Sequence, residues 1–261
     1  MRIWILAMIM LVASCSQVND SSKEKINQEH IVYSTIWFQN SAEAKALYYQ
    51  GFNLAKLRVK EFVGIDGEKP KAVVVDIDET MVDNSLFQGK SIEKGEGYSS
   101  EFWAEWSNLA KAKALPGAVE FTKFCDSLGV RVVYISNRKV QELEKTMKNM
   151  DSLGFAFVNP ENFLLKEETS GKEERRKIAM EKYDIVLLLG DNLNDFSDVF
   201  ENRGDDWGVS LVEKYRNEFG KRFIVFPNPM YGDWEKNIYG NQKGLTEEAK
   251  FKFRRDAIDK Y

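Results

Sequence analysis

Two carboxylates stand two positions apart at a point where both could act in one reaction. Asp76 and Asp78 flank Ile77 and directly follow an apolar run, residues 71–75. One carboxylate can attack an electrophilic centre, and a second can transfer the proton that the displacement requires. Phosphoryl transfer needs such a pair, together with cations that neutralise charge on the phosphoryl oxygens. If the backbone turns after the run, both side chains can reach one reaction centre.

A second acidic pair lies much further along the chain. Asp191 and Asp195 follow another apolar run, and Gly190 between the run and the acids allows a close backbone approach. These oxygen ligands suit Mg²⁺, a hard cation that retains waters. His30 is the only histidine and lies in the polar N-terminal region, so zinc centres and histidine-based mechanisms are disfavoured.

The apolar runs have the pattern of strands buried on both faces of a parallel sheet. The strands are expected at residues 71–76, 130–136 and 184–191. Helical patterns at residues 119–128 and 173–182 precede the second and third of them, which predicts an α/β fold with a mainly parallel sheet.

Polar side chains stand where these three strands end. The strand-end residues are Asp76, Ser136 and Asp191. Active sites of such sheets form beyond the carboxyl ends of the strands, so the three groups are expected to converge. Each alone would more often be a solvated or turn-forming residue, and it is the joint placement that favours a site. A fourth strand is expected at residues 222–226, leading into Pro227-Asn228-Pro229.

Two further segments complete the expected domain. Residues 41–62 carry apolar side chains at helical spacing, which predicts a long amphipathic helix. The segment at residues 84–116 is too long for a simple crossover and predicts a small cap. The chain has 261 residues, 43% of them hydrophobic, so it can bury a sizeable core. The net charge is −4, so the chain lacks the excess of basic residues that is typical of proteins that bind polymeric nucleic acid.

The N-terminus has the pattern of an export signal. Arg2 precedes an apolar run, residues 3–12, that is too short to span a bilayer permanently, so residues 1–14 are predicted to be a signal peptide. Leu11-Val12-Ala13-Ser14-Cys15 resembles a bacterial lipobox, which makes Cys15 the expected lipidation site. An uncleaved anchor, or a soluble export signal with an incidental cysteine, is the alternative. Residues 15–29 are polar and predict a flexible tether, leaving residues 30–261 as the folded domain.

Four ordered pieces resemble the motifs of the haloacid dehalogenase (HAD) superfamily. With the lipobox and Ser41-Ala42-Glu43, they are similar to the class C acid phosphatases, which are bacterial lipoprotein phosphatases and nucleotidases. The pieces are Asp76-Ile77-Asp78-Glu79-Thr80, Ile135-Ser136-Asn137-Arg138, Lys172, and Gly190-Asp191-Asn192-Leu193-Asn194-Asp195. The resemblance implies a HAD-like, Rossmannoid parallel sheet flanked by helices, with a small, mainly α-helical cap built from the N-terminal helix and residues 84–116.

The resemblance also implies roles for the residues that carry it. Asp76 would be the nucleophile and Asp78 the proton donor and later the base. Ser136, Asn137 and Lys172 would bind the phosphoryl group, although Lys177 lies close enough in the sequence to be the alternative lysine. Mg²⁺ would be held by Asp76, the backbone carbonyl of Asp78 and Asp191, with Asp195 supporting either the metal waters or the lysine.

Three aromatic residues match positions that line the substrate pocket in this family, namely Tyr98, Trp103 and Tyr231. Aromatic faces can stack on a nucleobase or an aryl group, which favours nucleoside monophosphates and aryl phosphates. Core packing is the alternative for all three and the preferred interpretation of Trp106.

The resemblance implies an enzyme anchored by lipid to the bacterial outer membrane or cell surface, facing the periplasm or exterior. A homodimer is the assembly that it suggests. Two other functions stay open: a phosphotransferase or mutase of the same superfamily, and a lipoprotein that binds a ligand such as haem.

Overall fold

The computed structural model describes residues 26–261. The predicted signal peptide, Cys15 and most of the predicted tether lie outside the described residues. The first element, the 3₁₀ helix η1 (Ile26–Ile31), begins inside the segment predicted as a tether, so regular structure starts before the expected boundary at His30.

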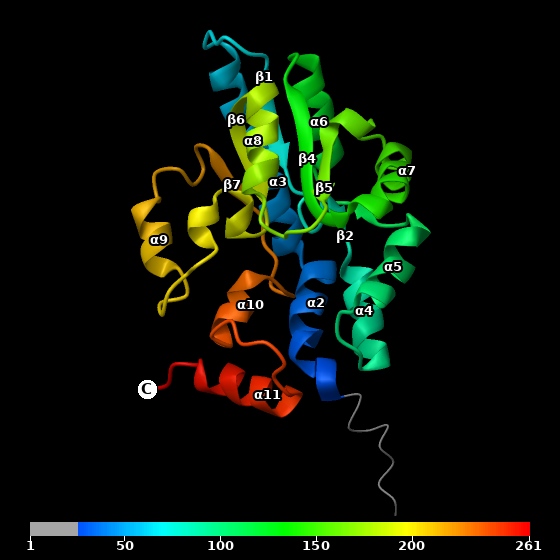
Figure 1. The fold of residues 1–261 in the computed structure, drawn as a ribbon, viewed down its shortest axis with the longest axis vertical. Helices are drawn as coiled ribbons and strands as arrows, with labels where there is room; N and C mark the ends of the chain where they lie inside the picture. The colour runs from blue at the N-terminus through cyan, green and yellow to red at the C-terminus, as the bar shows by residue number, and fades with distance from the viewer. Residues whose placement is uncertain (1–25) are drawn as a thin grey trace, which may run out of the picture.

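A five-stranded sheet forms the centre of the fold (Figure 1). All its pairings are parallel, and the strand order is β5-β4-β1-β6-β7. The bounds are β1 Lys71–Val75, β4 Arg131–Lys139, β5 Phe163–Lys166, β6 Asp184–Gly190 and β7 Phe223–Val225. The predicted parallel α/β sheet is confirmed, and β5 is a strand that the sequence did not predict. Because β1 lies between β4 and β6, the three strands predicted to end in polar groups are neighbours.

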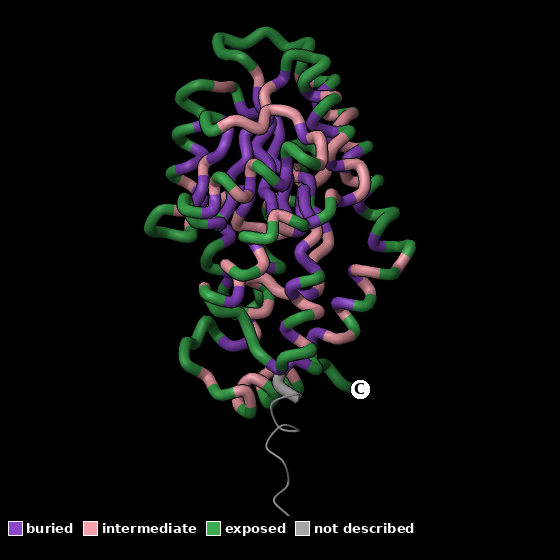
Figure 2. Tube along the Cα trace, turned by 90° about the vertical axis from the view of Figure 1, so that its right-hand side faces the viewer, coloured by how far each residue is buried: buried purple, intermediate pink, exposed green. Residues whose placement is uncertain are grey.

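Helices cover both faces of the sheet in three layers. On β1, Val73 and Val75 belong to one buried cluster, while Ala72 and Val74 belong to the other, as the alternation of side chains along a strand requires. Helices α3 and α6 pack on the first face and α8 on the second. Figure 2 shows the buried residues concentrated in this sheet region.

The predicted helices form close to their expected bounds. Ser41 begins α3, because its hydroxyl accepts a hydrogen bond of 3.0 Å from the amide of Ala44. The α-helices are α2 Val32–Asn40, α3 Ala42–Val63, α4 Ser85–Lys94, α5 Ser100–Leu109, α6 Ala118–Ser127, α7 Leu143–Leu153, α8 Glu173–Lys182, α9 Val209–Lys214, α10 Asp233–Ile238 and α11 Glu247–Asp256. The 3₁₀ helices after η1 are η2 Val140–Glu142, η3 Pro160–Asn162, η4 Leu193–Asp195 and η5 Asp198–Phe200.

A group of helices lies beyond one end of the sheet and includes the segment at residues 84–116 that was predicted as a cap. Figure 1 shows α2, α4, α10 and α11 below the sheet, with α5 beside α4. Helix α2 packs against α4 and η1, and α5 packs against α7 of the core. A two-stranded antiparallel pair, β2 (Val82–Asp83) and β3 (Lys113–Ala114), closes the base of the inserted segment. Helices α10 and α11 add to this end and were not predicted.

Among residues 26–261, none of the helices is both long enough and apolar enough to cross a bilayer. Cys125 on α6 is buried in the core.

Candidate active site

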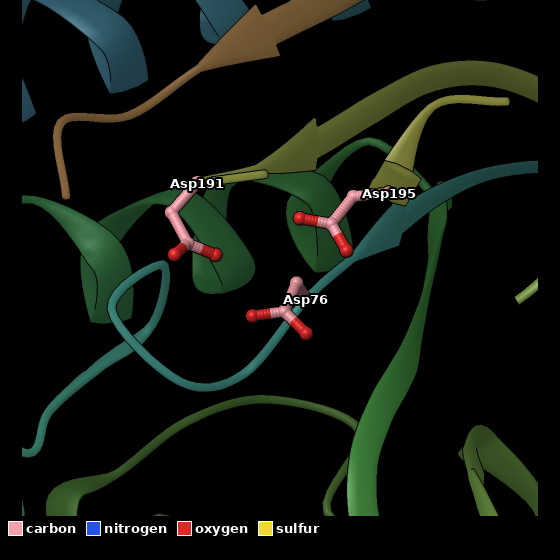
Figure 3. A group of neighbouring side chains, drawn as sticks. All are labelled: Asp76, Asp191 and Asp195. Atoms are coloured by element: carbon pink, nitrogen blue, oxygen red, sulfur yellow. The ribbon is translucent and has the colours of Figure 1, made fainter. Parts of the chain in front are cut away.

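Three aspartates from two neighbouring strands converge at the carboxyl end of the sheet. Asp76 follows β1, Asp191 follows β6, and Asp195 ends the 3₁₀ turn η4. One carboxylate oxygen from each lies within 4.8 Å of the others. Figure 3 shows the three carboxylates turned toward one another. The expected convergence of Asp76 and Asp191 is therefore present in the fold.

A buried lysine joins two of these carboxylates. The Nζ atom of Lys172 donates to Oδ1 of Asp76 and, at 2.6 Å, to Oδ1 of Asp195. Its side chain is 6% exposed, whereas Lys177 is 56% exposed and pairs with Glu174 on the surface of α8. The structure thus places Lys172, and not the alternative Lys177, beside the aspartates. Asp195 supports this lysine, which was one of its two expected placements.

Asp76 and Asp191 have pKa values well above those of exposed carboxyl groups. Burial raises the pKa of Asp76 to about 7, with further increases from Asp195 and Asp78, against the lowering effect of Lys172. Burial and the neighbouring Asp195 and Asp76 raise the pKa of Asp191 well above its usual range. Burial lowers the pKa of Lys172, but Asp195 and Asp76 raise it more, so the ammonium stays charged. The three carboxylates repel one another, which is the electrostatic condition that a bound cation relieves.

The turn after β6 is fixed by close packing and hydrogen bonds. A Cβ on Gly190 would lie 2.3 Å from Oδ2 of Asp195, so this position requires glycine. Oδ2 of Asp195 accepts the amide of Asn192 at 3.0 Å, and Oδ2 of Asp191 accepts the side-chain amide of Asn228 at 2.8 Å. Asn228 lies in the Pro227-Asn228-Pro229 segment that follows β7, so the end of this neighbouring strand also helps to orient Asp191.

Asp78 points to a different set of partners. Oδ1 accepts hydrogen bonds from Arg138 NH2 at 2.8 Å, Arg138 Nε at 3.0 Å and the Asn84 side chain at 2.8 Å. Oδ2 has longer contacts, to Arg138 Nε at 3.2 Å and to the hydroxyl of Ser136 at 3.3 Å. The carboxylate of Asp78 is not one of the three that cluster, which agrees with an expected metal contact through its backbone carbonyl alone.

The carboxyl-terminal part of β4 is held by Arg175. Its guanidinium donates to the carbonyl of Ser136 at 2.5 Å and to Oδ1 of Asn137 at 2.7 Å. This contact turns the Asn137 amide oxygen toward Arg175 and its NH₂ group away from it. Asn137 borders a cavity beside the aspartates, whereas Ser136 is fully buried with its hydroxyl toward Asp78.

A cavity of about 900 Å³ opens from the aspartates toward the helices at this end of the molecule. Asp76, Asp78, Lys172 and Asp191 border its inner part. The three predicted pocket aromatics, Tyr98, Trp103 and Tyr231, all border it as well. Tyr98 is 66% exposed, so its ring is available at the mouth of the cavity. Trp106 packs against the core, as predicted, and its indole also donates to Asn84.

Several residues that shape the site were not predicted from the sequence. Glu79 is completely buried, and this burial raises the pKa of its carboxyl group well above the usual range. Its carboxylate accepts a hydrogen bond from the hydroxyl of Tyr231 and another, of 2.8 Å, from the backbone amide of Asn84. Glu79 also has a φ of 57°, in the left-handed region. In the sequence, only the position of Glu79 next to Asp78 indicated that it could belong to the site. Arg138 belongs to the Ile135-Ser136-Asn137-Arg138 motif, but no role was predicted for it. The residues around Arg175 and Asn228 in the sequence do not indicate which side chains these two residues contact.

Comparison with known proteins gives a consistent assignment. A sequence model of the HAD superfamily, subfamily IIIB (acid phosphatase), matches residues 8–234. The structure is similar to that of the class C acid phosphatase from Bacillus anthracis, with 39% sequence identity and a TM-score of 0.86, over 91% of this chain and 99% of that one. The same Bacillus protein with tungstate bound gives the same values.

More distant relatives come from soybean. The chain is 26% identical to the stem 28 kDa glycoprotein of Glycine max over 165 residues, and 26% identical to a stem 31 kDa glycoprotein over 161 residues. These matches cover 60% and 59% of this chain but only 58% and 57% of the two relatives, so the chain spans less than two thirds of their length. The family match over most of the sequence, together with the shared fold and the clustered aspartates, shows that the chain belongs to the acid phosphatase family that forms subfamily IIIB of the HAD superfamily.

Proposed function

We propose that this protein hydrolyses phosphate monoesters with Mg²⁺ and through a phosphoaspartate intermediate. The observation that carries the proposal is the buried group of Asp76, Asp191 and Asp195 with Lys172 bound between two of them. A two-step phosphoryl transfer needs a carboxylate nucleophile next to a cation, and it also needs a second carboxyl group that is held separately.

The donor set suits Mg²⁺. Three carboxylates lie close enough to share an ion, and the donors are all oxygen, which a hard cation prefers. Asp76, Asp191 and the backbone carbonyl of Asp78 would hold the ion, with Asp195 adjacent. When bound, the ion would neutralise charge on the phosphoryl oxygens.

The protein's own groups would perform the bond changes. A carboxylate oxygen of Asp76 attacks phosphorus, the bond to the ester oxygen breaks, and Asp78 gives that oxygen its proton. In the second step, Asp78 takes a proton from water, the water oxygen attacks phosphorus, and the bond to Asp76 breaks to release phosphate. Asn137 and Lys172 donate to the phosphoryl oxygens, and Ser136 helps to fix the end of β4 that carries Asn137.

The leaving group would lie in the aromatic part of the cavity. Tyr98, Trp103 and Tyr231 border this part, and stacking on such rings contributes about 1–3 kcal/mol per base. Nucleoside monophosphates and aryl phosphates are therefore the proposed substrates. Lipid attachment at Cys15, a position at the outer membrane or cell surface, and assembly as a homodimer remain predictions.

Release of inorganic phosphate from a substrate panel tests this function. The panel compares a nucleoside 5′-monophosphate, an aryl phosphate and a sugar phosphate, each with Mg²⁺ and with a chelator. We expect Mg²⁺-dependent release, fastest from the first two substrates. Equal rates on all three would remove the argument for aromatic stacking, and undiminished rates in chelator would contradict the metal assignment.

The metal-free protein should lose stability as the pH rises. Asp76 has a folded pKa of about 7, above the ordinary unfolded value, so the folded state binds more protons between the two values. Stability is therefore highest below the unfolded pKa and falls as the pH rises from about 4 through 7; the raised pKa of Asp191 acts in the same direction. Urea unfolding with a chelator at pH 5 and pH 8 measures the difference.

Added Mg²⁺ should reverse this loss at pH 8. At a concentration of 100 times its dissociation constant, a ligand that binds only the folded state stabilises it by about 2.7 kcal/mol. The gain should be smaller at pH 5, because protons compete for the same carboxylates. A metal-free protein that is more stable at pH 8 than at pH 5 would contradict the repulsion among the three aspartates.

A further inference from the structure

The partners of Asp78 connect it to the cap. The Nε1–H of Trp106 on α5 donates to Oδ1 of Asn84 at 2.9 Å. Arg138 NH2 approaches the same oxygen at 3.3 Å. An amide has its acceptor and donors on opposite sides, so these two donors turn the NH₂ group of Asn84 toward Asp78, which it contacts at 2.8 Å. The orientation of Asn84 is thus set by Arg138 together with a tryptophan of the inserted segment.

Arg138 is itself fixed on several sides. Its side chain is 3% exposed, and its NH1 donates to the hydroxyl of Thr146 on α7 at 3.1 Å. The ring of Trp103 lies over the guanidinium, 5.5 Å from its centroid to Cζ. A planar guanidinium held in this way offers its donors in one direction, and they meet Asp78.

The two oxygens of Asp78 consequently differ. Oδ1 takes three close donors, at 2.8, 2.8 and 3.0 Å, while Oδ2 has only the two longer contacts, at 3.2 and 3.3 Å. An oxygen that already accepts three strong hydrogen bonds is a poor carrier of a proton, because protonation would break them. Asp78 also borders the cavity in which the ester would lie.

We propose that Arg138, Asn84 and Trp106 are positioning residues that anchor Oδ1 of Asp78 and leave Oδ2 to pass the proton to the leaving oxygen. The inference rests on the proposed function, in which Asp78 is the proton donor. It assigns to the cap, through α5, a part in aligning the proton donor in addition to its part in forming the pocket.

The test is the dependence of kcat/KM on the leaving group. Phenyl phosphate and 4-nitrophenyl phosphate have similar size, but the phenolate leaves poorly and needs a proton, whereas the nitrophenolate leaves readily. Trp106→Phe keeps an aromatic ring, smaller than the indole, and removes the N–H donor. We expect kcat/KM to fall about 3–10-fold for phenyl phosphate and less than twofold for 4-nitrophenyl phosphate, since one hydrogen bond loses its orientation.

Arg138→Lys should act in the same direction and more strongly. Loss of the paired contacts is expected to lower kcat/KM for phenyl phosphate about 10–100-fold, with a smaller loss for 4-nitrophenyl phosphate. The control for Trp106→Phe is Trp207→Phe, which makes the same substitution at a half-exposed position that does not border the cavity. This control should leave kcat/KM unchanged for both substrates. Equal losses on both substrates in Trp106→Phe and Arg138→Lys would overturn the proposal.

An Asp78→Asn background separates this inference from the proposed function. Asp78→Asn alone should itself be more harmful to phenyl phosphate, and adding Trp106→Phe should then cost little more, because the two residues act through one step. Full additivity in the double variant would overturn the positioning role. Equal losses on both substrates in Asp78→Asn alone would show instead that Asp78 is not the proton donor.

Discussion

Asp76→Asn is expected to abolish phosphate release while leaving the fold intact. The substitution keeps the size and an oxygen toward Lys172 but removes the nucleophile, so kcat should fall by on the order of 10⁴-fold or more. Because burial and neighbouring acids raise the pKa of Asp76, its ionised form disfavours folding without metal. The metal-free variant should therefore be as stable as the parent at pH 8, or more stable. Phosphate release and urea unfolding measure the two effects.

The matched control for this experiment is Asp184→Asn. Asp184 is the first residue of β6, the strand that leads to Asp191 in the site. Its half-exposed side chain, however, pairs with Lys71 and does not border the cavity. Surface ion pairs of this kind contribute about 0–1 kcal/mol, so activity and stability should change little. Normal turnover in Asp76→Asn, or a comparable loss in Asp184→Asn, would contradict the role of Asp76 as nucleophile.

Lys172→Met is expected to affect activity and stability together. The substitution preserves much of the volume but removes the charge that is hydrogen-bonded to Asp76 and Asp195 in a buried site. Removing one partner of a buried ion pair costs about 3–5 kcal/mol, because the remaining charge is left uncompensated. Loss of a cation that stabilises the transferring group should lower kcat on the order of 10²–10³-fold. Urea unfolding and steady-state kinetics measure these changes.

Lys177→Met provides the comparison on the neighbouring helix. This lysine is exposed and pairs only with Glu174 in the described contacts, so the same substitution should leave both quantities nearly unchanged. The metal-free Lys172→Met protein should also lose more stability between pH 5 and pH 8 than the parent, since the carboxylates then lack their lowering partner. Similar behaviour of the two variants would mean that Lys172 has no special place in the site.

The strands that carry the site could be predicted because burial on both faces leaves a clear pattern. The runs at β1, β4 and β6 are continuously apolar, and each gives way to a polar residue at its carboxyl end. In a parallel sheet those ends share one edge, so the meeting of Asp76 and Asp191 follows from the fold class. The short edge strand β5 had no comparable signal, since only two of its four residues are buried.

The apolar pattern of the sequence could not show which lysine lies beside Asp76, nor which residues contact Glu79. Lys172 and Lys177 are five positions apart, and only the packing of α8 on the sheet places one beside Asp76 and the other in solvent. Likewise, Glu79 belongs to the first motif but had no predicted role, and the turn after β1 buries it against Tyr231, which lies more than 150 positions further along the chain.

The sequence by itself determined which strand ends carry acids and therefore where chemistry is possible, because strands that are buried on both faces leave continuous apolar runs in the sequence. Only the tertiary structure decided which partners those acids have: Lys172 for Asp76, Asn228 for Asp191, and Arg138 with Asn84 for Asp78. Hydrogen bonds and pKa shifts depend on distances between segments that are remote in the chain, and those distances exist only after the helices and strands have packed.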